Sequence, residues 1–83
     1  MESLFTITVR YFAKLREERG IAEETLKIGP VSVRELFNDL KSVHSFSLSV
    51  AMMRVAVNKE FVSWDCIVKA GDEVTFIPPV SGG

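Results

Sequence analysis

Apolar and polar residues alternate along the start of the chain, over residues 4–12. A period of two places successive side chains on opposite faces of an extended chain, so the pattern predicts a half-buried strand. Its apolar face carries Phe5, Ile7, Val9 and Tyr11. Phe12 is the exception, because the alternation puts this large ring on the polar face.

Four further short runs have the composition of strands: residues 24–28, 53–58, 61–62 and 73–77. Turn-forming residues separate them, namely Gly29-Pro30, Asn58-Lys59-Glu60 and Ala70-Gly71-Asp72. In the last strand Val74 and Phe76 are predicted to point inward, which leaves Ile77 on the outer face.

Two segments carry helical signals. Residues 13–19 are predicted to form a short charged helix, and Gly20 supplies the left-handed residue that ends it. A longer helix starts at a capping box made by Ser32 and Glu35. Its apolar positions recur every three or four residues: Val33, Leu36, Phe37, Leu40 and then Val43 or His44. We expect this helix to end near Val43 and a loop with room for a helical turn to follow, over residues 42–50.

This order of elements predicts an α+β fold, a mixed sheet covered on one side by one main helix. It is the architecture of the ubiquitin-like β-grasp fold. In such a sheet the first and last strands are neighbours, so Phe12 and Ile77 share one outer surface. We assign residues 1–77 to the β-grasp domain and residues 78–83 to an extended C-terminal tail.

Length and composition limit the classes of function. A chain of 83 residues with 47% hydrophobic and 25% charged residues is typical of one globular domain. A net charge of −1 argues against a nucleic-acid partner. The sequence lacks an apolar run of the ~18 residues that a membrane span needs. A single cysteine fits a reducing, cytoplasmic setting.

The most unusual segment is the end of the chain, Pro78-Pro79-Val80-Ser81-Gly82-Gly83. The two prolines fix φ and cannot donate to a sheet, so the last strand must stop before them. The two glycines have no side chains, which lets the backbone enter a narrow slot. Fully extended, the segment reaches roughly 20 Å at about 3.3–3.6 Å per residue. It is long enough to carry the carboxylate of Gly83 into a pocket of another protein.

Other candidate reactive groups have simpler interpretations. Cys66 has only Lys69 as a nearby cation, so a small buried apolar residue is the better interpretation. His44 stands alone at the end of a helix, without a second ligand or base. Three carboxylate pairs are interpreted as solvated surface: Glu17-Glu18, Glu23-Glu24 and Asp72-Glu73. We predict no metal site, no bound cofactor and no catalysis by this chain alone.

Three apolar residues are predicted to lie outside the core. Phe12, Phe61 and Ile77 occupy outward or turn-edge positions. Single exposed apolar residues are common, whereas a cluster of them beside a protruding tail is typical of a docking surface. We therefore predict that these three residues bind a partner.

Several segments resemble those of the small, sulfur-carrying subunit of molybdopterin synthase. They are Tyr11-Phe12-Ala13-Lys14-Leu15-Arg16-Glu17, Val57-Asn58, Gly71-Asp72-Glu73-Val74 and the segment from Phe76 to Gly83. The resemblance runs the full length of the chain, and Pro-Pro-Val-Ser-Gly-Gly is its most specific part. Thiamine sulfur carriers share the fold and the terminal Gly-Gly but are usually shorter, without the two prolines.

The resemblance implies a function for the terminal glycine. An E1-like enzyme, using ATP and Mg²⁺ (and zinc in some cases), would adenylate the residue matching Gly83. Sulfur from a donor protein would then convert it to a thiocarboxylate. A large catalytic subunit would receive the tail and pass the sulfur to cyclic pyranopterin monophosphate during molybdenum cofactor biosynthesis. The resemblance also implies a heterotetramer of two small and two large subunits, with docking positions that match Phe12, Phe61 and Ile77.

Two other classes of function stay open on the sequence. A ubiquitin-like modifier, or a sulfur carrier for thiamine or tRNA thiolation, begins with the same activation of a terminal Gly-Gly. A plain interaction module with an inert tail would never be activated by ATP. Only the Pro-Pro-Val-Ser ending distinguishes the first of these from the sulfur carrier of molybdopterin synthase.

Overall fold

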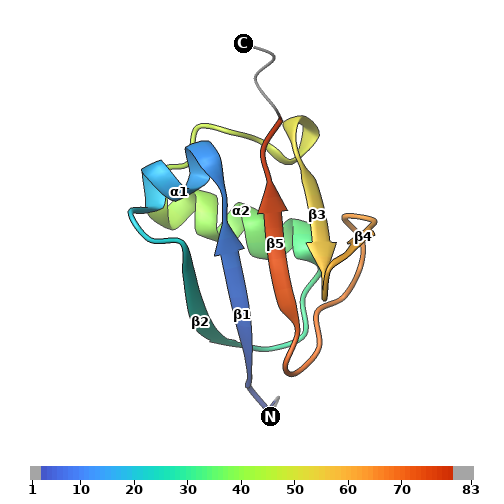
Figure 1. Ribbon diagram of the computed structural model, residues 1–83. Helices are drawn as coiled ribbons and strands as arrows, with labels where there is room; N and C mark the ends of the chain where they lie inside the picture. The colour runs from blue at the N-terminus through green and yellow to red at the C-terminus, as the bar shows by residue number, and fades with distance from the viewer. Residues whose placement is uncertain (1–2, 80–83) are drawn as a thin grey trace.

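The structure, a computed structural model, describes residues 3–79 and consists of a curved sheet with one long helix on one side (Figure 1). The elements in chain order are β1 (Phe5–Tyr11), α1 (Ala13–Arg19), β2 (Glu23–Ile28), α2 (Val33–His44), a 3-10 turn η1 (Val50–Met52), β3 (Arg54–Val57), β4 (Glu60–Val62) and β5 (Glu73–Ile77). The predicted α+β class and the predicted order of elements are confirmed.

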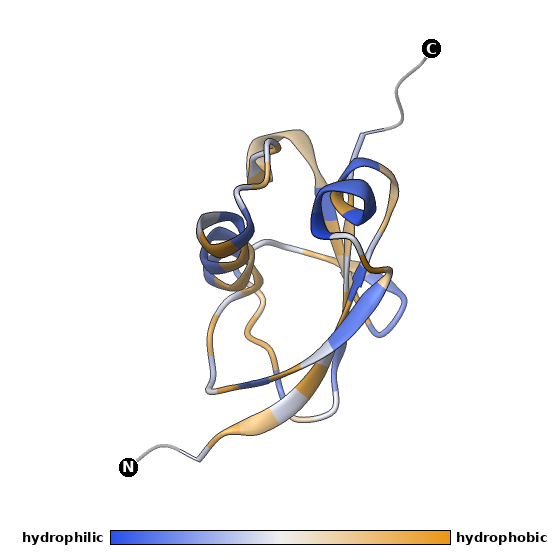
Figure 2. Cartoon of the chain, turned by 90° about the vertical axis from the view of Figure 1, so that its left-hand side faces the viewer, coloured by the Kyte–Doolittle hydropathy of each residue, from blue (hydrophilic) through white to orange (hydrophobic). Residues whose placement is uncertain are grey.

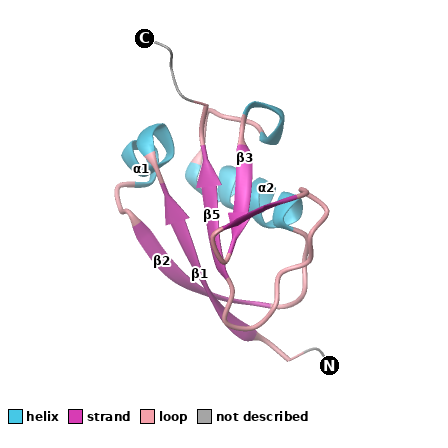
Figure 3. Cartoon of the chain, turned by 45° about the vertical axis from the view of Figure 1, so that its right-hand side comes forward, coloured by secondary structure: helices cyan, strands magenta, loops and turns pink. Residues whose placement is uncertain are grey.

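The five strands form one mixed sheet in the order β2-β1-β5-β3-β4. β1 and β5 run parallel, whereas the β1–β2, β3–β4 and β3–β5 pairs are antiparallel. The first and last strands are therefore neighbours at the centre of the sheet, as predicted. Figure 3 shows that the arrows of β1 and β5 point toward the same end of the sheet, the end where α1 lies.

The core lies between the sheet and α2, which Figure 2 shows on one side of the sheet. The inward faces of β1 and β5 alternate as predicted, because Val9, Val74 and Phe76 are all fully buried. Aromatic rings fill the centre of the core. The centre of the Phe37 ring lies 5.1 Å from that of Phe76, and the Trp64 ring stacks on Phe76 with 6.1 Å between the ring centres. These rings anchor the last strand, and therefore the start of the tail, to the main helix.

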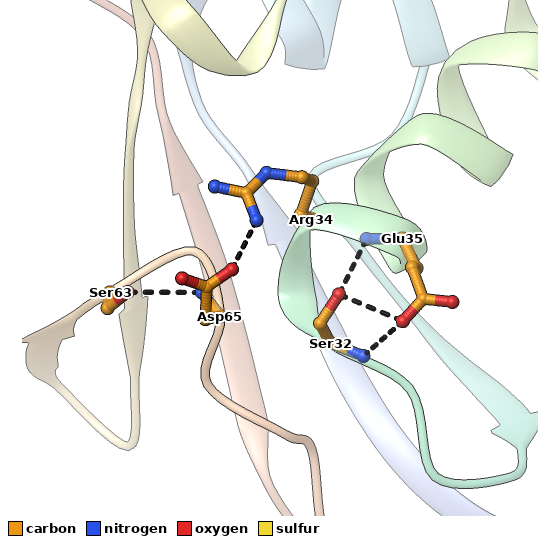
Figure 4. Close-up of polar contacts among 5 residues, drawn as sticks. All are labelled: Ser32, Arg34, Glu35, Ser63 and Asp65. Atoms are coloured by element: carbon orange, nitrogen blue, oxygen red, sulfur yellow. Dashed lines mark hydrogen bonds and ion pairs between the residues drawn. The ribbon is translucent and has the colours of Figure 1, made fainter.

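The capping box at the start of α2 is present (Figure 4). The hydroxyl of Ser32 accepts a hydrogen bond of 3.1 Å from the backbone N–H of Glu35. In return, the backbone N–H of Ser32 donates to the Glu35 carboxylate at 3.2 Å. Two of the free N–H groups at this helix end are therefore satisfied by side chains that the sequence alone identifies.

The start of α2 is also fixed to the loop that precedes β5. The backbone N–H of Val33 donates to the carbonyl of Cys66 at 2.9 Å, and that of Arg34 donates to Trp64 at 3.1 Å. The Arg34 guanidinium pairs with the Asp65 carboxylate above these bonds (Figure 4). This loop thus completes the layer that covers the core beside β3.

The end of α2 agrees with the prediction, because the helix extends to His44, one residue past Val43. Of the two residues predicted for its last apolar position, Val43 is 73% exposed, whereas His44 is half-buried beside Phe46. Ser45 adopts a left-handed conformation (φ 57°), which turns the chain so that Phe46 enters the core instead. The Phe46 ring then stacks on the Phe37 ring, with 5.8 Å between the ring centres.

Left-handed residues shape two of the turns. Gly20 ends α1 with φ 85°, the role predicted for it. Asn58 and Lys59 have φ of 53° and 71° between β3 and β4, which is the conformation of a tight two-residue hairpin turn. The predicted turn at this place is confirmed, and β4 begins at Glu60 rather than Phe61.

Candidate functional site

The tail begins where β5 ends, at the same end of the strands as α1 and η1 (Figure 1). The strand ends at Ile77 and two prolines follow, as predicted from their lack of an N–H donor. Pro78 is buried and Pro79 is exposed. Gly83 and the residues before it (Val80, Ser81 and Gly82) lie outside the described residues. The predicted reacting carboxylate is therefore known from the sequence alone.

A hollow lies on each side of Pro78 and Pro79. One, of about 480 Å³, is lined by Ala51, Met52, Met53, Arg54, Ile77 and the two prolines. The other, of about 320 Å³, is lined by Ala13, Lys14, Glu17, Leu48 and the same two prolines. Met52 is 52% exposed beside the first hollow and was missed from the sequence, because its 3-10 turn has no clear pattern.

The three predicted docking residues share one surface. In the β3–β5 pair Ile77 is the partner of Arg54, and in the β3–β4 pair Phe61 is the partner of Ala56. Arg54 and Ala56 are two residues apart on β3 and point to the same face, away from the core. Phe12 follows β1, the other neighbour of β5, so Ile77 lies on the strand between the two aromatic residues.

Their exposure differs. Phe61 is 65% exposed and Phe12 is 45% exposed, whereas Ile77 is half-buried. The predicted outward placement is thus confirmed for both rings. Their role in binding a partner stays a prediction. We call the surface formed by Phe12, Ile77 and Phe61 the apolar face of the sheet.

Two arginines lie over the aromatic rings of the apolar face. The guanidinium carbon of Arg10 is 5.8 Å from the centre of the Phe12 ring, and that of Arg54 is 5.4 Å from the centre of the Phe61 ring. Nothing in the sequence alone singles out either arginine. The Arg54 contact depends on the β3–β4 pairing, which brings together residues on opposite strands.

A polar cluster fixes α1 to β2 beneath Phe12. The Glu24 carboxylate accepts hydrogen bonds from Arg19 at 2.8 and 3.0 Å and from the Tyr11 hydroxyl at 2.6 Å. The hydrogen bond from Arg19, assisted by that from Tyr11, holds the pKa of Glu24 below its ordinary value, although burial acts in the opposite direction. The interpretation of Glu23-Glu24 as solvated surface is therefore wrong for Glu24.

Burial, together with the hydrogen bond to Glu24, raises the pKa of Tyr11 well above its ordinary value. The hydrogen bond to Glu24 also raises the pKa of Arg19. All three groups thus stay in one protonation state across the neutral range, with Glu24 ionised and Tyr11 neutral. The cluster ties the last residue of α1, Arg19, to β2 and to the end of β1, so it helps to hold the helix against the sheet.

A second contact joins α1 to the loop after α2. The Glu18 carboxylate accepts hydrogen bonds from the hydroxyl and the backbone N–H of Ser47, at 2.7 and 3.0 Å. These bonds hold the pKa of Glu18 below its ordinary value. Ser47 immediately precedes Leu48, which lines the hollow between α1 and the prolines. The contact therefore helps to define the shape of that hollow.

At the opposite end of the sheet, the interpretation of Asp72-Glu73 as solvated surface is wrong for Asp72. It is 9% exposed and accepts hydrogen bonds from the Asn58 amide at 2.9 Å and from the backbone N–H of Lys69 at 2.8 Å. Because the Asn58 side chain also accepts from the backbone N–H of Glu73, Asp72 organises the two turns there. Its role in the described structure is to connect these turns.

The two remaining candidate residues, Cys66 and His44, both lie against the core. Cys66 is half-buried and packs against the core, with its Sγ 3.9 Å from the carbonyl oxygen of Ile67. His44 lies 5.6 Å from the Phe46 ring at the end of α2. Within residues 3–79, no group of three His, Cys, Asp or Glu side chains is arranged to hold a metal ion. Neither α1 nor α2 is long and apolar enough to cross a membrane.

Comparison with protein families gives a match over almost the whole chain. Residues 9–83 match the model of the ThiS family. The chain is 40% identical to the molybdopterin synthase sulfur carrier subunit of Chlamydomonas reinhardtii, over 93% of this chain and 98% of that protein. It is 31% identical to the human protein of the same name, over the full length of both.

Solved structures show the same fold. A Pyrococcus furiosus protein, described as a candidate subunit 1 of molybdopterin converting factor, has a TM-score of 0.78 at 35% identity, covering 92% of this chain and 99% of that one. SAMP1, a small archaeal modifier protein from Haloferax volcanii, has a TM-score of 0.77 at 25% identity, covering 94% and 99%. A Helicobacter pylori chain, solved in a complex of subunits 1 and 2 of molybdopterin-converting factor, has a TM-score of 0.63 at 24% identity, covering 95% and 100%.

Proposed function

The chain belongs to the ThiS family, and on this premise we propose that it is the sulfur carrier subunit of a molybdopterin synthase. The observation that carries the proposal is the end-to-end match to relatives that bear this name, at 31–40% identity. The geometry supports it, because the tail starts beside an apolar face with two exposed aromatic rings. In this function the chain is a non-catalytic, sulfur-donating subunit.

The chemistry takes place at the carboxylate of Gly83. This group is ionised at neutral pH, with an ordinary pKa of about 3.3–3.7. One of its oxygens attacks the α-phosphorus of ATP, held with Mg²⁺ by an E1-like enzyme, and pyrophosphate leaves. The resulting acyl adenylate has lost the negative charge and gained a good leaving group. Sulfide (HS⁻), the sulfur source of this step, then attacks the carbonyl and displaces AMP, and loss of the S–H proton leaves the thiocarboxylate.

The prolines and the glycines of the tail have different roles in bringing the thiocarboxylate to its acceptor. Pro78 is buried against the domain and fixes the direction in which the chain leaves β5. Gly82 and Gly83 carry no Cβ, so a narrow channel in a partner can enclose the backbone on all sides. The thiocarboxylate thus reaches a shielded site, where it donates sulfur to cyclic pyranopterin monophosphate.

A large catalytic subunit is the proposed receiver of the tail. A Helicobacter pylori chain of the same fold was solved together with a second subunit of molybdopterin-converting factor. For this chain we place the large subunit against Phe12, Ile77 and Phe61, in a heterotetramer of two small and two large subunits. The E1-like enzyme and the sulfur donor protein are its other proposed partners.

Reconstitution tests the proposal directly. The full chain is incubated with the E1-like enzyme, ATP, Mg²⁺ and a sulfur source, and its intact mass is measured. We expect a gain that corresponds to the exchange of one oxygen for sulfur, and the loaded chain should convert cyclic pyranopterin monophosphate to molybdopterin once the large subunit is added. A loaded chain that gives no molybdopterin with that subunit would contradict the proposed pathway.

A protein modifier is the second candidate, and the likeness to SAMP1 favours it specifically. Activation of the terminal glycine would be the same, but the acyl group would pass to lysine amines of many proteins. Peptide mass spectrometry of cell extracts separates the two functions. Gly-Gly remnants on many lysines would support the modifier, and one stable complex with a large subunit would support the sulfur carrier.

A further inference from the structure

The apolar face carries positive charge at both of its aromatic residues. The guanidinium of Arg10 lies over the Phe12 ring and that of Arg54 over the Phe61 ring, at 5.8 and 5.4 Å (Figure 1 shows the strands that bear them). A contact of this kind is worth about 0.5–1 kcal/mol at an exposed site, so it holds each arginine in place. Each ring is therefore presented together with a guanidinium group.

Arg54 occupies the centre of this surface. It is the cross-strand partner of Ile77 and lines the hollow beside the prolines. Arg54 also lines a different hollow, of about 300 Å³, which it shares with Phe61. Any protein that covers both Ile77 and Phe61 must therefore cover the guanidinium of Arg54.

The two arginines differ in their partners within the chain. Arg10 lies 3.9 Å from the Glu73 carboxylate, a long and solvent-exposed pair. Arg54 makes no ion pair with any carboxylate of residues 3–79. Its side chain is exposed, so solvent has access to the charge. When a partner removes that water, the charge must be paired again or the binding energy falls.

We propose that the large subunit presents a carboxylate to Arg54 at the centre of the apolar face, with a second acidic group near Arg10. The inference rests on the proposed function and adds the chemistry by which this chain selects its partner. Charge complementarity supports it, because two cations flank the apolar face of a chain whose net charge is −1. An acidic receiving surface fits this face, and a basic or neutral one does not.

The geometry of arginine strengthens the case for a carboxylate. The contact with Phe61 leaves N–H groups of the Arg54 guanidinium free, because no hydrogen bond or ion pair within residues 3–79 uses them. Those groups form a fork that matches the two oxygens of a carboxylate. Because the Phe61 ring restricts the side chain, less rotational freedom is lost when the fork binds.

The test compares charge variants of Arg54 in titrations of the full chain against the purified large subunit, at low and high ionic strength. Arg54→Met keeps an apolar side chain over Phe61 but removes the charge, and Arg54→Glu reverses it. Lys27→Glu is the matched control, since it makes the same charge reversal on the same face at the far end of β2. Melting curves establish that each variant is folded.

We expect Arg54→Met to weaken binding about tenfold, because the partner's carboxylate is left unpaired, and Arg54→Glu to weaken it further. Lys27→Glu should bind like the unaltered chain, and high salt should reduce the differences. Equal or tighter binding by Arg54→Met overturns the inference, since an unpaired arginine only costs binding energy. If the unaltered chain fails to bind the large subunit, the proposed function fails and this inference fails with it.

Discussion

Tyr11 and Phe76 are direct partners in the parallel pair of β1 and β5, and both are buried. The residues that follow them, Phe12 and Ile77, therefore lie side by side at the same end of the sheet. Phe12 is the residue before α1, and Ile77 is the residue before the tail. One pairing thus places the Phe12 ring beside the residue from which the C-terminal segment starts, so a partner that binds one of them also meets the other.

The first prediction concerns the apolar face. Phe61→Asp should weaken binding to the large subunit at least about tenfold, equivalent to ~1.4 kcal/mol, because a central aromatic residue can contribute about 2 kcal/mol or more. An introduced charge must also lose its water on docking. Since Phe61 is 65% exposed, the melting temperature should change little. Titration calorimetry and a melting curve of the same sample measure both effects.

Val43 provides the control for that prediction. It is 73% exposed on α2, which lies on the other side of the sheet from the docking residues. Val43→Asp makes a similar change of an exposed apolar residue and should leave the affinity unchanged. Equal losses in Phe61→Asp and Val43→Asp would show that the apolar face has no special role in docking.

The second prediction concerns the polar cluster at α1. Glu24→Gln should lower the free energy of unfolding by about 1–2 kcal/mol at neutral pH, because the charged hydrogen bonds from Arg19 are lost. The pKa of Glu24 is below its ordinary value of 4.5 in the folded chain. Its stabilisation is therefore complete above pH 4.5 and is lost as the pH falls through the folded value. The difference between the two proteins should shrink below pH 4.5.

Urea unfolding at several pH values measures this difference. Glu18 has a lowered pKa too, but it is present in both proteins, so its contribution cancels in the comparison. A stability difference that stays constant between neutral pH and pH 3 would show that the charge of Glu24 is not what stabilises α1.

The third prediction concerns the thiol. Cys66→Ala should lower stability by about 1 kcal/mol, because a half-buried side chain that packs against the core is shortened. The terminus should still accept sulfur, since the thiol contacts a backbone carbonyl in the described structure. Intact mass after incubation with the activating enzyme reports the loading. A folded Cys66→Ala protein that accepts no sulfur would make the thiol a relay in the transfer.

Most of the fold could be predicted because its signals are local. The alternation in β1, the left-handed Gly20 and the capping box of Ser32 and Glu35 each depend on residues within four positions of one another. Such signals do not require knowledge of the tertiary structure. The pairing of β1 with β5 followed from the order of the elements, since that order specifies the β-grasp sheet.

The polar contacts around the site could not be predicted in this way. Glu18 meets Ser47 across 29 positions, and Arg54 meets Phe61 only through the hairpin. A charged residue in a turn or on a helix surface has the same sequence signature whether it is solvated or bonded. The tertiary structure decides between the two, and it also decides that Val43 is exposed while Phe46 enters the core.

The last prediction concerns the position of the terminal glycine. The distance from the buried Pro78 to the reacting carbonyl is set by the five residues that follow it. Each residue contributes up to about 3.3–3.6 Å when extended. Deleting Gly83, or adding one alanine after it, therefore moves the carbonyl by about one such step. A shift of even 1 Å from the productive geometry can reduce a reaction about 100-fold.

Both variants should lose sulfur loading while the domain stays folded, because the terminal residues lie beyond β5 and the core. Intact mass after incubation with the E1-like enzyme, ATP and a sulfur source measures loading, and a melting curve measures folding. Gly82→Ala is a useful companion, since it keeps the length and adds only a Cβ. If the narrow channel matters, this variant should load or deliver sulfur more slowly. Loading of the extended chain without prior removal of the added alanine would show that the position of the terminal carbonyl is not what the activating enzyme recognises.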